Sequence, residues 1–390
     1  MKKKILSVLL AGLAMTSFNG CVIEENKTDP AQTTTSAQIE YNVNDYVTLG
    51  EYKNLEVTLN GDYEYTDEAF EEYLDSCILN SNLFVPDDSQ TVVAEDSIVN
   101  VDYVGSQDGV AFEGGSAENQ NLDIANNCGA GTGGGYISGF TSGLVGYSVG
   151  DEVAYEVTFP DSYPNNEDLA GQTVVFTFNI NYIAKQVETR DDLTDEIVSE
   201  NFGYDTVDAL VEALQTSYKS TLESNLQSDK ETAVLNTLIN GCTVSEVPED
   251  LLQARVDVEL NIDERQCQNQ FSTSFKDYLE SMGYNYDDIL EQIKSSAEED
   301  TKTRLILQAI AEAEGIEVDE EGYNDFVNDY CSQYNYTDLE TLYSDCTVTG
   351  YDGERYFKFY YLTEKALDYC VENAVVNIEP AEEATEAVEE

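Results

Sequence analysis

Residues 136–180 read YISGFTSGLVGYSVGDEVAYEVTFPDSYPNNEDLAGQTVVFTFNI, and this stretch decides the fold. Apolar and polar residues alternate in its segments VAYEVTF and QTVVFTFNI, and Gly, Asn, Asp and Pro occupy the breaks between them. Alternation with a period of two is typical of strands that bury one face. The stretch therefore predicts antiparallel strands, preceded by at most a short helix.

The segment just before it, residues 126–140, reads NNCGAGTGGGYISGF, and Gly129, Gly131 and Gly134 match the pattern G-x-G-x-x-G. A dinucleotide-binding loop with this pattern needs a strand that runs into the glycines and a long helix that runs out of them. Here only NLDI precedes the loop, further glycines follow it, and no Gly-Lys-Ser/Thr is present. We therefore predict a flexible loop rather than a phosphate site.

Farther from this stretch the periodicity changes. Residues 46–60 and the segment SIVNVDYVG alternate like strands, whereas residues 66–79 predict a helix with Thr66 as its N-cap. From about residue 190 onward, apolar residues recur at helical spacing. The predicted helices there are a long one from Val207 to Leu226, one opened by Pro248, two within 275–293 broken at Gly283, and one within 302–318 stopped by Gly315.

These elements predict an α+β fold with segregated parts, because strands and helices do not alternate. A small antiparallel β-rich domain with a short helix is followed by an extended all-α domain. The predicted organisation is a signal peptide (1–21), a polar linker (22–45), a strand-helix connecting segment (46–91), the β-rich domain (92–185), the helical domain (186–376) and an acidic tail (377–390).

The N-terminus has the pattern of a secretory signal. Three lysines precede the short apolar run ILSVLLAGLAM, and SFNGC follows, ending at Cys21. A cysteine directly after Gly20 suggests a bacterial lipoprotein, with the lipid on Cys21 as the membrane anchor. Cleavage without lipidation, or an unprocessed anchor, is the alternative. We expect a protein held at the extracytoplasmic face of the cell membrane.

Charge and composition exclude several classes of function. The chain has 78 acidic and 18 basic side chains, so its surface repels nucleic acid. It has no histidine and no C-x-x-C pair, which argues against a zinc site and against a Ser-His or Cys-His nucleophile. We expect no metal and no cofactor. Besides Cys21 there are seven cysteines, and the sequence leaves open whether these form disulfides or are buried thiols.

Several motifs occur together over residues 96–184: DYVG, AFEGGS, ISGF, VGDEV, FPDSYP and VVFTFNI. This region resembles an FKBP-type peptidyl-prolyl isomerase domain, specifically the version found in trigger factor. The segments FKDYLESMGYNYDDILEQI and LILQAIAEAEGIEVDEE look like the helical substrate-cradle domain of that family, and residues 46–74 are similar to its connecting segment. The family's basic ribosome-binding head has no counterpart in this sequence, so a ribosome is not expected as a partner.

The resemblance implies a site that rotates X-Pro bonds in an apolar, aromatic environment. It assigns Phe140 as the floor, and Tyr103 and Tyr163 as border residues with a hydroxyl for the substrate carbonyl. The implied catalytic residues are Tyr103, Phe112, Glu113, Phe140 and Tyr163, and the implied substrate-binding residues are Leu122, Tyr136, Ile137 and Phe176. For each aromatic residue, packing in the β core is the other interpretation.

Two functions follow from this resemblance. The first is a membrane-anchored foldase that isomerises X-Pro bonds and holds unfolded, proline-containing exported polypeptides. The alternative is a non-catalytic binding lipoprotein whose FKBP-like domain has lost activity. The aromatic residues favour the first function, and the long glycine-rich loop at 125–135 favours the second.

Overall fold

The computed structural model of the chain describes residues 38–132 and 134–380. Contacts group the described residues into two compact units. We call residues 64–223 the sheet unit, and residues 38–63 with 224–380 the helical unit. The expected signal peptide, most of the linker, Cys21 and the end of the acidic tail lie outside the described residues.

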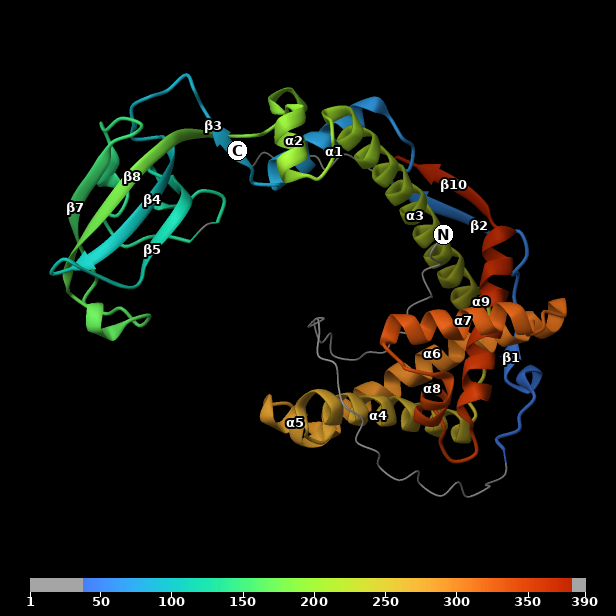
Figure 1. The fold of residues 1–390 in the computed structure, drawn as a ribbon. Coiled ribbons are helices and arrows are strands. Elements are labelled where there is room, and N and C mark those ends of the chain that lie inside the picture. Colours follow the sequence, from blue (N-terminus) through green and yellow to red (C-terminus); the bar gives the residue numbers. More distant parts are fainter. Residues whose placement is uncertain (1–37, 133, 381–390) are drawn as a thin grey trace, which may run out of the picture. The chain divides into compact units, whose positions relative to one another are not determined.

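The sheet unit contains a six-stranded antiparallel sheet (Figure 1). Its strand order is β3-β8-β4-β5-β6, and β7 also pairs with β8. In β8 the alternate residues Val174, Phe176, Phe178 and Ile180 are buried, which confirms the predicted half-buried strand. The strands are β3 (Phe84–Pro86), β4 (Ile98–Gln107), β5 (Val110–Asp123), β6 (Cys128–Gly129), β7 (Glu152–Thr158) and β8 (Thr173–Gln186).

Among the described residues between β6 and β7, the only helical element is a 3-10 turn, η2 (Ser142–Leu144). Gly139 and Gly146, on either side of the turn, have φ values of +85° and +88°. Glycine tolerates these values because it lacks a Cβ, and they stop a helix from propagating. The prediction of at most a short helix is confirmed.

Helices α1 (Asp67–Asn80), α2 (Asp195–Asn201) and the first turns of α3 (Val207–Gly241) share a second hydrophobic core in the sheet unit. The side-chain oxygen of Thr66 accepts a hydrogen bond of 3.1 Å from the backbone N–H of Ala69, which confirms the predicted N-cap. The predicted helix from Val207 is also confirmed, and it continues to Gly241.

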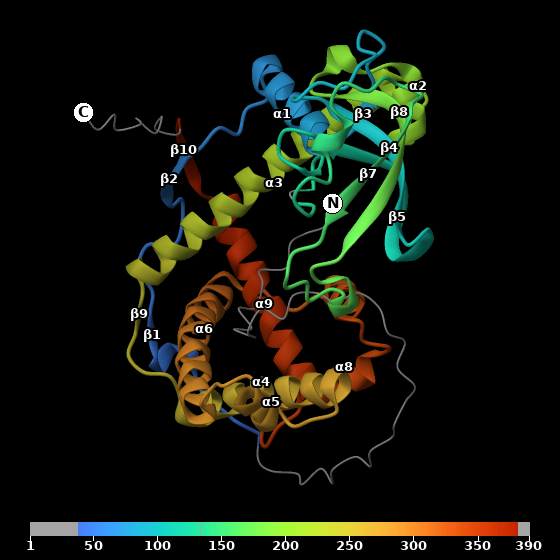
Figure 2. The same ribbon diagram turned by 90° about the vertical axis from the view of Figure 1, so that its left-hand side faces the viewer.

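The helical unit has its core around α6 and α9, which lie side by side (Figure 2). Buried aliphatic residues of α6 face aromatic residues of α9, as the helical periodicity of both segments requires. The helices of this unit, besides the end of α3, are α4 (Glu249–Phe271), α5 (Phe275–Ser281), α6 (Tyr286–Glu314), α7 (Glu320–Tyr334), α8 (Leu339–Asp345) and α9 (Gly353–Glu372). The α+β prediction is therefore confirmed.

Two helix predictions need correction. The segment 302–318 does not begin a separate helix, because α6 runs unbroken from Tyr286; no glycine or proline interrupts residues 286–314. Pro248 is the N-cap of α4 rather than its first helical residue. The predicted break at Gly283 and the stop at Gly315 are confirmed, with φ values of +86° and +68°.

Residues 46–60 do not form one strand. They form β1 (Val47–Thr48) and β2 (Glu56–Asn60), and Asn54 between them has a left-handed φ of +53° that breaks the extended run. β1 pairs with β9 (Thr243–Val244), and β2 pairs in parallel with β10 (Val375–Glu379). β10 reaches Glu379, so the strand extends into the segment from residue 377 that is predicted from the sequence as the acidic tail.

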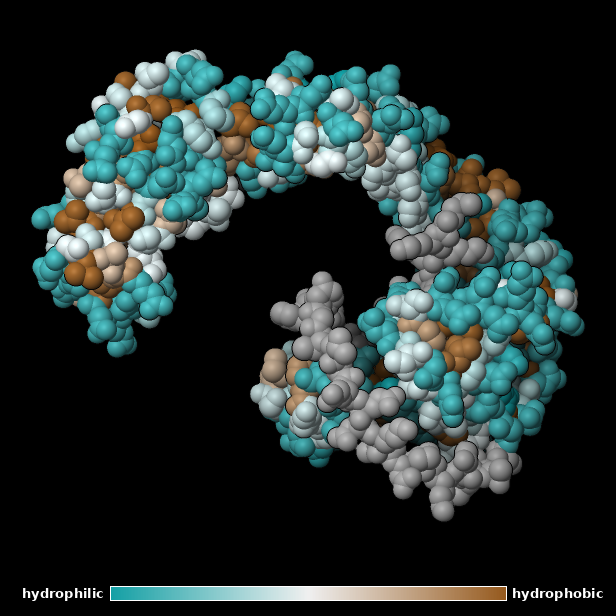
Figure 3. Space-filling model, in the orientation of Figure 1, coloured by the Kyte–Doolittle hydropathy of each residue, from teal (hydrophilic) through white to brown (hydrophobic). Residues whose placement is uncertain are grey.

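Hydrophilic residues cover most of the face that Figure 3 shows, in keeping with the acidic composition. The seven cysteines among the described residues are all free thiols, and five of them are buried. Burial raises the pKa of the Cys346 and Cys370 thiols to about 12, so at neutral pH these groups are un-ionised core residues.

Candidate functional site

The sheet, the loop after β7 and the segment before η2 together place eight of the nine predicted site residues in one hydrophobic core. We call its rings the aromatic cluster: Tyr103 of β4, Phe112 of β5, Tyr136 and Phe140 before η2, Phe159 and Tyr163 after β7, and Phe176 and Phe178 of β8. Strand alternation directs the β4, β5 and β8 rings to one side of the sheet.

Phe140 is the centre of the aromatic cluster. Its ring centroid lies 5.1 Å from that of Tyr103, 4.9 Å from that of Phe176 and 5.2 Å from that of Phe178, each at a steep interplanar angle. Edge-to-face packing of this kind is a favoured geometry for aromatic rings. Only 2% of Phe140 is exposed, so its ring is held in the core and excluded from water.

Tyr136 lies against the ring of Phe140. The two rings stack at a centroid distance of 4.4 Å with an interplanar angle of 21°. Burial raises the pKa of the Tyr103 and Tyr136 hydroxyls, and the interaction between these hydroxyls further raises the pKa of Tyr103. Tyr136 itself is half-buried, so its outer face meets solvent while its inner face closes the floor.

Phe112 occupies a space that two glycines provide. A Cβ at Gly105 would lie 2.5 Å from the Phe112 ring, and a Cβ at Gly115 would lie 2.4 Å from it. Real Cβ atoms are not found so close to other heavy atoms, so both positions must lack a side chain for the ring to sit there. The ring then reaches Phe176 at a centroid distance of 5.9 Å and Phe159 at 6.1 Å.

Tyr163 lies at the edge of the aromatic cluster, with its ring 4.8 Å from that of Phe159. It is half-buried, and within the described residues its hydroxyl has no hydrogen-bond partner. A phenolic hydroxyl that is unused in the folded chain is available to donate to a ligand carbonyl. This position fits the predicted role of Tyr163 at the border.

Of the predicted site residues, one lies outside the hydrophobic core of the sheet unit and two lie deep within it. Glu113 is exposed and does not join the aromatic cluster, because it follows Phe112 in a strand and successive side chains point to opposite faces. Leu122 is fully buried and Phe176 is 4% exposed, so both belong to the supporting core. Ile137 is half-buried beside Tyr136, and its role in binding stays a prediction.

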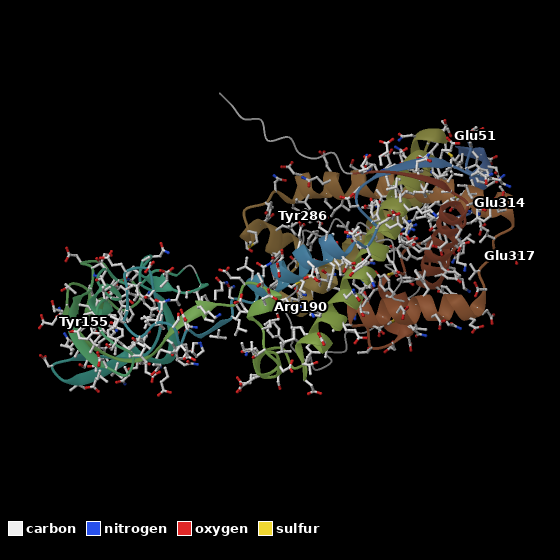
Figure 4. The ribbon with its side chains drawn as sticks, turned by 90° about the horizontal axis from the view of Figure 1, so that it is seen from above. Glu51, Tyr155, Arg190, Tyr286, Glu314 and Glu317 are labelled. Atoms are coloured by element: carbon white, nitrogen blue, oxygen red, sulfur yellow. The ribbon has the colours of Figure 1, made fainter. Side chains whose placement is uncertain are left out.

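Two supporting residues were missed from the sequence. Tyr155 of β7, labelled in Figure 4, donates its hydroxyl proton to the backbone carbonyl oxygen of Phe140. Its inward position follows from the alternation of Val153, Tyr155 and Val157, so this residue could have been found. Asn127 hydrogen-bonds the backbone at Tyr136, but no local pattern in the loop indicates that contact.

The chemistry available here is apolar contact and hydrogen bonding. Within residues 38–132 and 134–380, no group of three or more Cys, Asp or Glu side chains is arranged to hold a metal ion. In the same part of the chain, none of the helices is both long enough and apolar enough to cross a membrane.

The antiparallel sheet with its aromatic cluster defines an FKBP-type peptidyl-prolyl isomerase domain, and the family model for that domain matches residues 89–181. The model for the C-terminus of bacterial trigger factor matches residues 206–349. A relative named "Trigger factor 1" from Desulfitobacterium hafniense (strain Y51) is 31% identical over 328 residues, covering 84% of this chain and 73% of the relative. The chain therefore belongs to the trigger factor family.

Two further relatives and one solved structure are similar to this chain. A trigger factor from Halothermothrix orenii is 35% identical over 299 residues, which are 77% of this chain and 65% of that protein. One from Streptococcus suis (strain 05ZYH33) is 33% identical over 290 residues, and this chain again spans 65% of its length. A solved structure described as "Promiscuous Substrate Recognition in Folding and Assembly Activities of the Trigger Factor Chaperone" aligns with a TM-score of 0.38 at 16% identity, covering 84% of this chain and 72% of that one.

Proposed function

We propose that this protein catalyses cis/trans isomerisation of X-Pro peptide bonds and holds unfolded polypeptides. The observation that carries the proposal is the aromatic cluster centred on Phe140, in a region that matches the FKBP-type isomerase model. The match of residues 206–349 to the trigger factor C-terminus supports the holding activity.

Isomerisation in such a site needs neither a nucleophile nor a metal. The X-Pro amide resists rotation by about 18–20 kcal/mol because resonance gives its C–N bond partial double-bond character. The twisted amide is less polar than the planar one, so a dry, apolar surface favours the twisted state over the ground state. Phe140 and its neighbouring rings would form that surface, and the hydroxyl of Tyr163, which has no hydrogen-bond partner among the described residues, would bind a carbonyl of the substrate.

The prolyl ring takes the place of the Tyr136 ring on Phe140. Since Tyr136 stacks on Phe140 and only 2% of Phe140 is exposed, the Tyr136 ring must rotate outward before a substrate binds. Its half-buried position leaves solvent on its outer side, so the rotation needs no movement of the sheet.

The isomerase proposal is tested by the rate of cis-to-trans conversion of a short X-Pro peptide with the full chain. We expect acceleration that is lost in Phe140→Leu, which keeps an apolar side chain but removes the ring. The matched control is Phe326→Leu in the helical unit, where Phe326 packs against Tyr361; this variant should keep the full rate.

The same variants separate the two candidate functions. The Phe140→Leu variant should still prevent an unfolded client protein from aggregating, because holding a client does not require the Phe140 ring. If the wild-type chain holds the client but leaves the peptide rate unchanged, the non-catalytic binding function is correct and the isomerase proposal fails.

We also propose that the protein is a lipoprotein at the extracytoplasmic face of the cell membrane, with exported polypeptides as its clients. The support is the signal-like N-terminus ending at Cys21. Labelling of cells with a radioactive fatty acid should mark the wild-type protein and not Cys21→Ser. Equal labelling of Cys77→Ser and the wild type is the control, and unlabelled wild-type protein would contradict the proposal.

A further inference from the structure

The loop that precedes Tyr136 is organised by one asparagine. Asn127 has a left-handed φ of +49°, a conformation that asparagine tolerates better than most residues. Its backbone carbonyl accepts a hydrogen bond of 2.8 Å from the N–H of Tyr136. The loop is thus closed across its base, next to the β6 pairing with the end of β5.

The Asn127 side chain makes four further hydrogen bonds to the segment that carries the site. Its Nδ2 donates to the carbonyl oxygens of Tyr136 at 2.9 Å and Ile137 at 3.1 Å. Its Oδ1 accepts from the N–H of Thr141 at 3.1 Å and from the hydroxyl of Thr141 at 3.0 Å. Both amide protons and both lone pairs of the side chain are therefore used.

These contacts bracket Phe140. Tyr136 and Ile137 lie before it, and the fully buried Thr141 follows it directly. Within this short segment Gly139 has a φ of +85°, and no heavy atom beyond its chain neighbours lies within 4 Å of the position that a Cβ would take there. Ring packing and the Tyr155 hydroxyl hold Phe140 itself, whereas the side chain of Asn127 fixes the backbone on both sides of Phe140.

We infer that Asn127 is a positioning residue for prolyl isomerisation, holding residues 136–141 in the arrangement that the reaction requires. The inference rests on the proposed function of this site. Binding of a prolyl ring by apolar contact tolerates a small displacement of Phe140, whereas stabilisation of a twisted amide depends on accurate placement. Loss of the side chain should therefore lower kcat more than it raises KM.

The test uses the full chain and an X-Pro peptide. Asn127→Gly keeps the left-handed backbone but removes the amide, and its kcat/KM should fall by at least about tenfold, mostly in kcat. The matched control is Asn126→Ala. Asn126 is in the same loop, but its side chain hydrogen-bonds Asp123 rather than residues 136–141, so its loss should change kcat/KM by less than about twofold.

A second variant separates positioning from folding. In Asn127→Asp the acceptor oxygen is kept, but a second carboxylate oxygen faces the carbonyls of Tyr136 and Ile137. Protonation of the new carboxyl restores one donor, so the activity of this variant relative to the wild type should rise as the pH falls from about 8 to about 5. A purely structural role would change the urea unfolding midpoint without this pH profile.

The outcomes are distinct. An active wild type, a slow Asn127→Gly and a recovering Asn127→Asp support the inference. An active wild type with Asn127→Gly within about twofold of it overturns the inference and leaves the proposed function intact. An inactive but folded wild type overturns both, and it is recognised by the absence of any peptide acceleration before a variant is compared.

Discussion

The hydroxyl of Tyr155 donates a hydrogen bond to the backbone carbonyl of Phe140, and this contact ties the centre of the aromatic cluster to β7. The Tyr155 ring stacks on Phe178 at a centroid distance of 5.2 Å and lies directly against Gly143, where a Cβ would be 2.6 Å away. Burial raises the pKa of the Tyr155 hydroxyl well above its ordinary value, so it stays protonated and remains a donor. Packing fixes the Tyr155 ring, and the Tyr155 hydroxyl in turn fixes the backbone of Phe140.

Removal of this hydroxyl should affect catalysis and stability together. We expect Tyr155→Phe to lower the free energy of unfolding by about 1 kcal/mol, since one part-buried hydrogen bond is lost. We expect kcat/KM on an X-Pro peptide to fall by about threefold to tenfold. Tyr147→Phe is the control, because Tyr147 is exposed. A variant with unchanged turnover would show that the contact does not position Phe140.

Shortening Tyr136 should open the site. Its stacking on Phe140 is worth about 0.5–1.5 kcal/mol, and a substrate must displace it. Tyr136→Val should therefore lower KM by about twofold to tenfold, as measured by initial rates over a range of peptide concentrations. A higher KM would contradict this prediction and would assign Tyr136 a direct role in binding the prolyl ring.

Arg304 is a sensitive position in the helical unit. The residue is 2% exposed; it pairs with Asp300 at 3.0 Å, donates to the hydroxyl of Thr363 at 2.8 Å and lies 3.5 Å from the ring centroid of Tyr360. Its removal leaves the part-buried carboxylate of Asp300 without its guanidinium partner, so Arg304→Met should lower the free energy of unfolding by about 3–5 kcal/mol. Urea unfolding measures this loss.

A control for Arg304 lies on the same helix. Lys302 forms an ion pair of the same i,i+4 spacing with Glu298 at 2.6 Å, but both side chains are 42% exposed. Lys302→Met should change the free energy of unfolding by less than about 1 kcal/mol, because solvent screens an exposed pair. Equal effects of the two substitutions would contradict the importance of burial.

The stability of the protein should depend on the ionisation of Glu259. Burial raises its pKa from 4.5 to about 8, and the charges of Asp263 and Asp300 add to the effect. Between pH 4.5 and about pH 8, Glu259 keeps its proton in the folded chain but has lost it in the unfolded chain. The folded state therefore binds more protons, and the free energy of unfolding falls as the pH rises through this range.

Glu259→Gln removes this penalty. Between about pH 5 and about pH 8 the variant should lose about 3–4 kcal/mol less stability than the wild type in urea unfolding. Glu291→Gln, an exposed position on α6, should behave like the wild type. Parallel pH profiles for Glu259→Gln and the wild type would rule out a raised pKa at Glu259.

The fold was predictable where the signal is local. Alternation over β7 and β8 and the helical spacing after residue 207 come from residues close in sequence, and those elements are present. The pairing of Glu56 with Val375 was not predictable, because only the folded chain brings these residues together. The single long α6 was missed because its polar middle, residues 294–303, carries no apolar pattern, although tertiary packing keeps it helical.

The candidate site, like the fold, was predictable from the sequence only in part. The resemblance to FKBP-type domains named most rings of the cluster, but it also named Glu113, which strand alternation places on the other face. The hydrogen bonds from Tyr155 to Phe140 and from Asn127 to Ile137 join residues that are 15 and 10 positions apart. Such contacts depend on how turns fold back, which composition and periodicity do not specify.

The central claim is that the cluster around Phe140 catalyses rotation about X-Pro bonds. Its most direct test is NMR exchange between the cis and trans signals of an X-Pro peptide mixed with a small amount of the full chain. Uncatalysed exchange takes about tens to hundreds of seconds. We predict exchange much faster than this with the wild type, and the uncatalysed rate with Phe140→Leu. Uncatalysed exchange with a folded wild-type chain would contradict this claim.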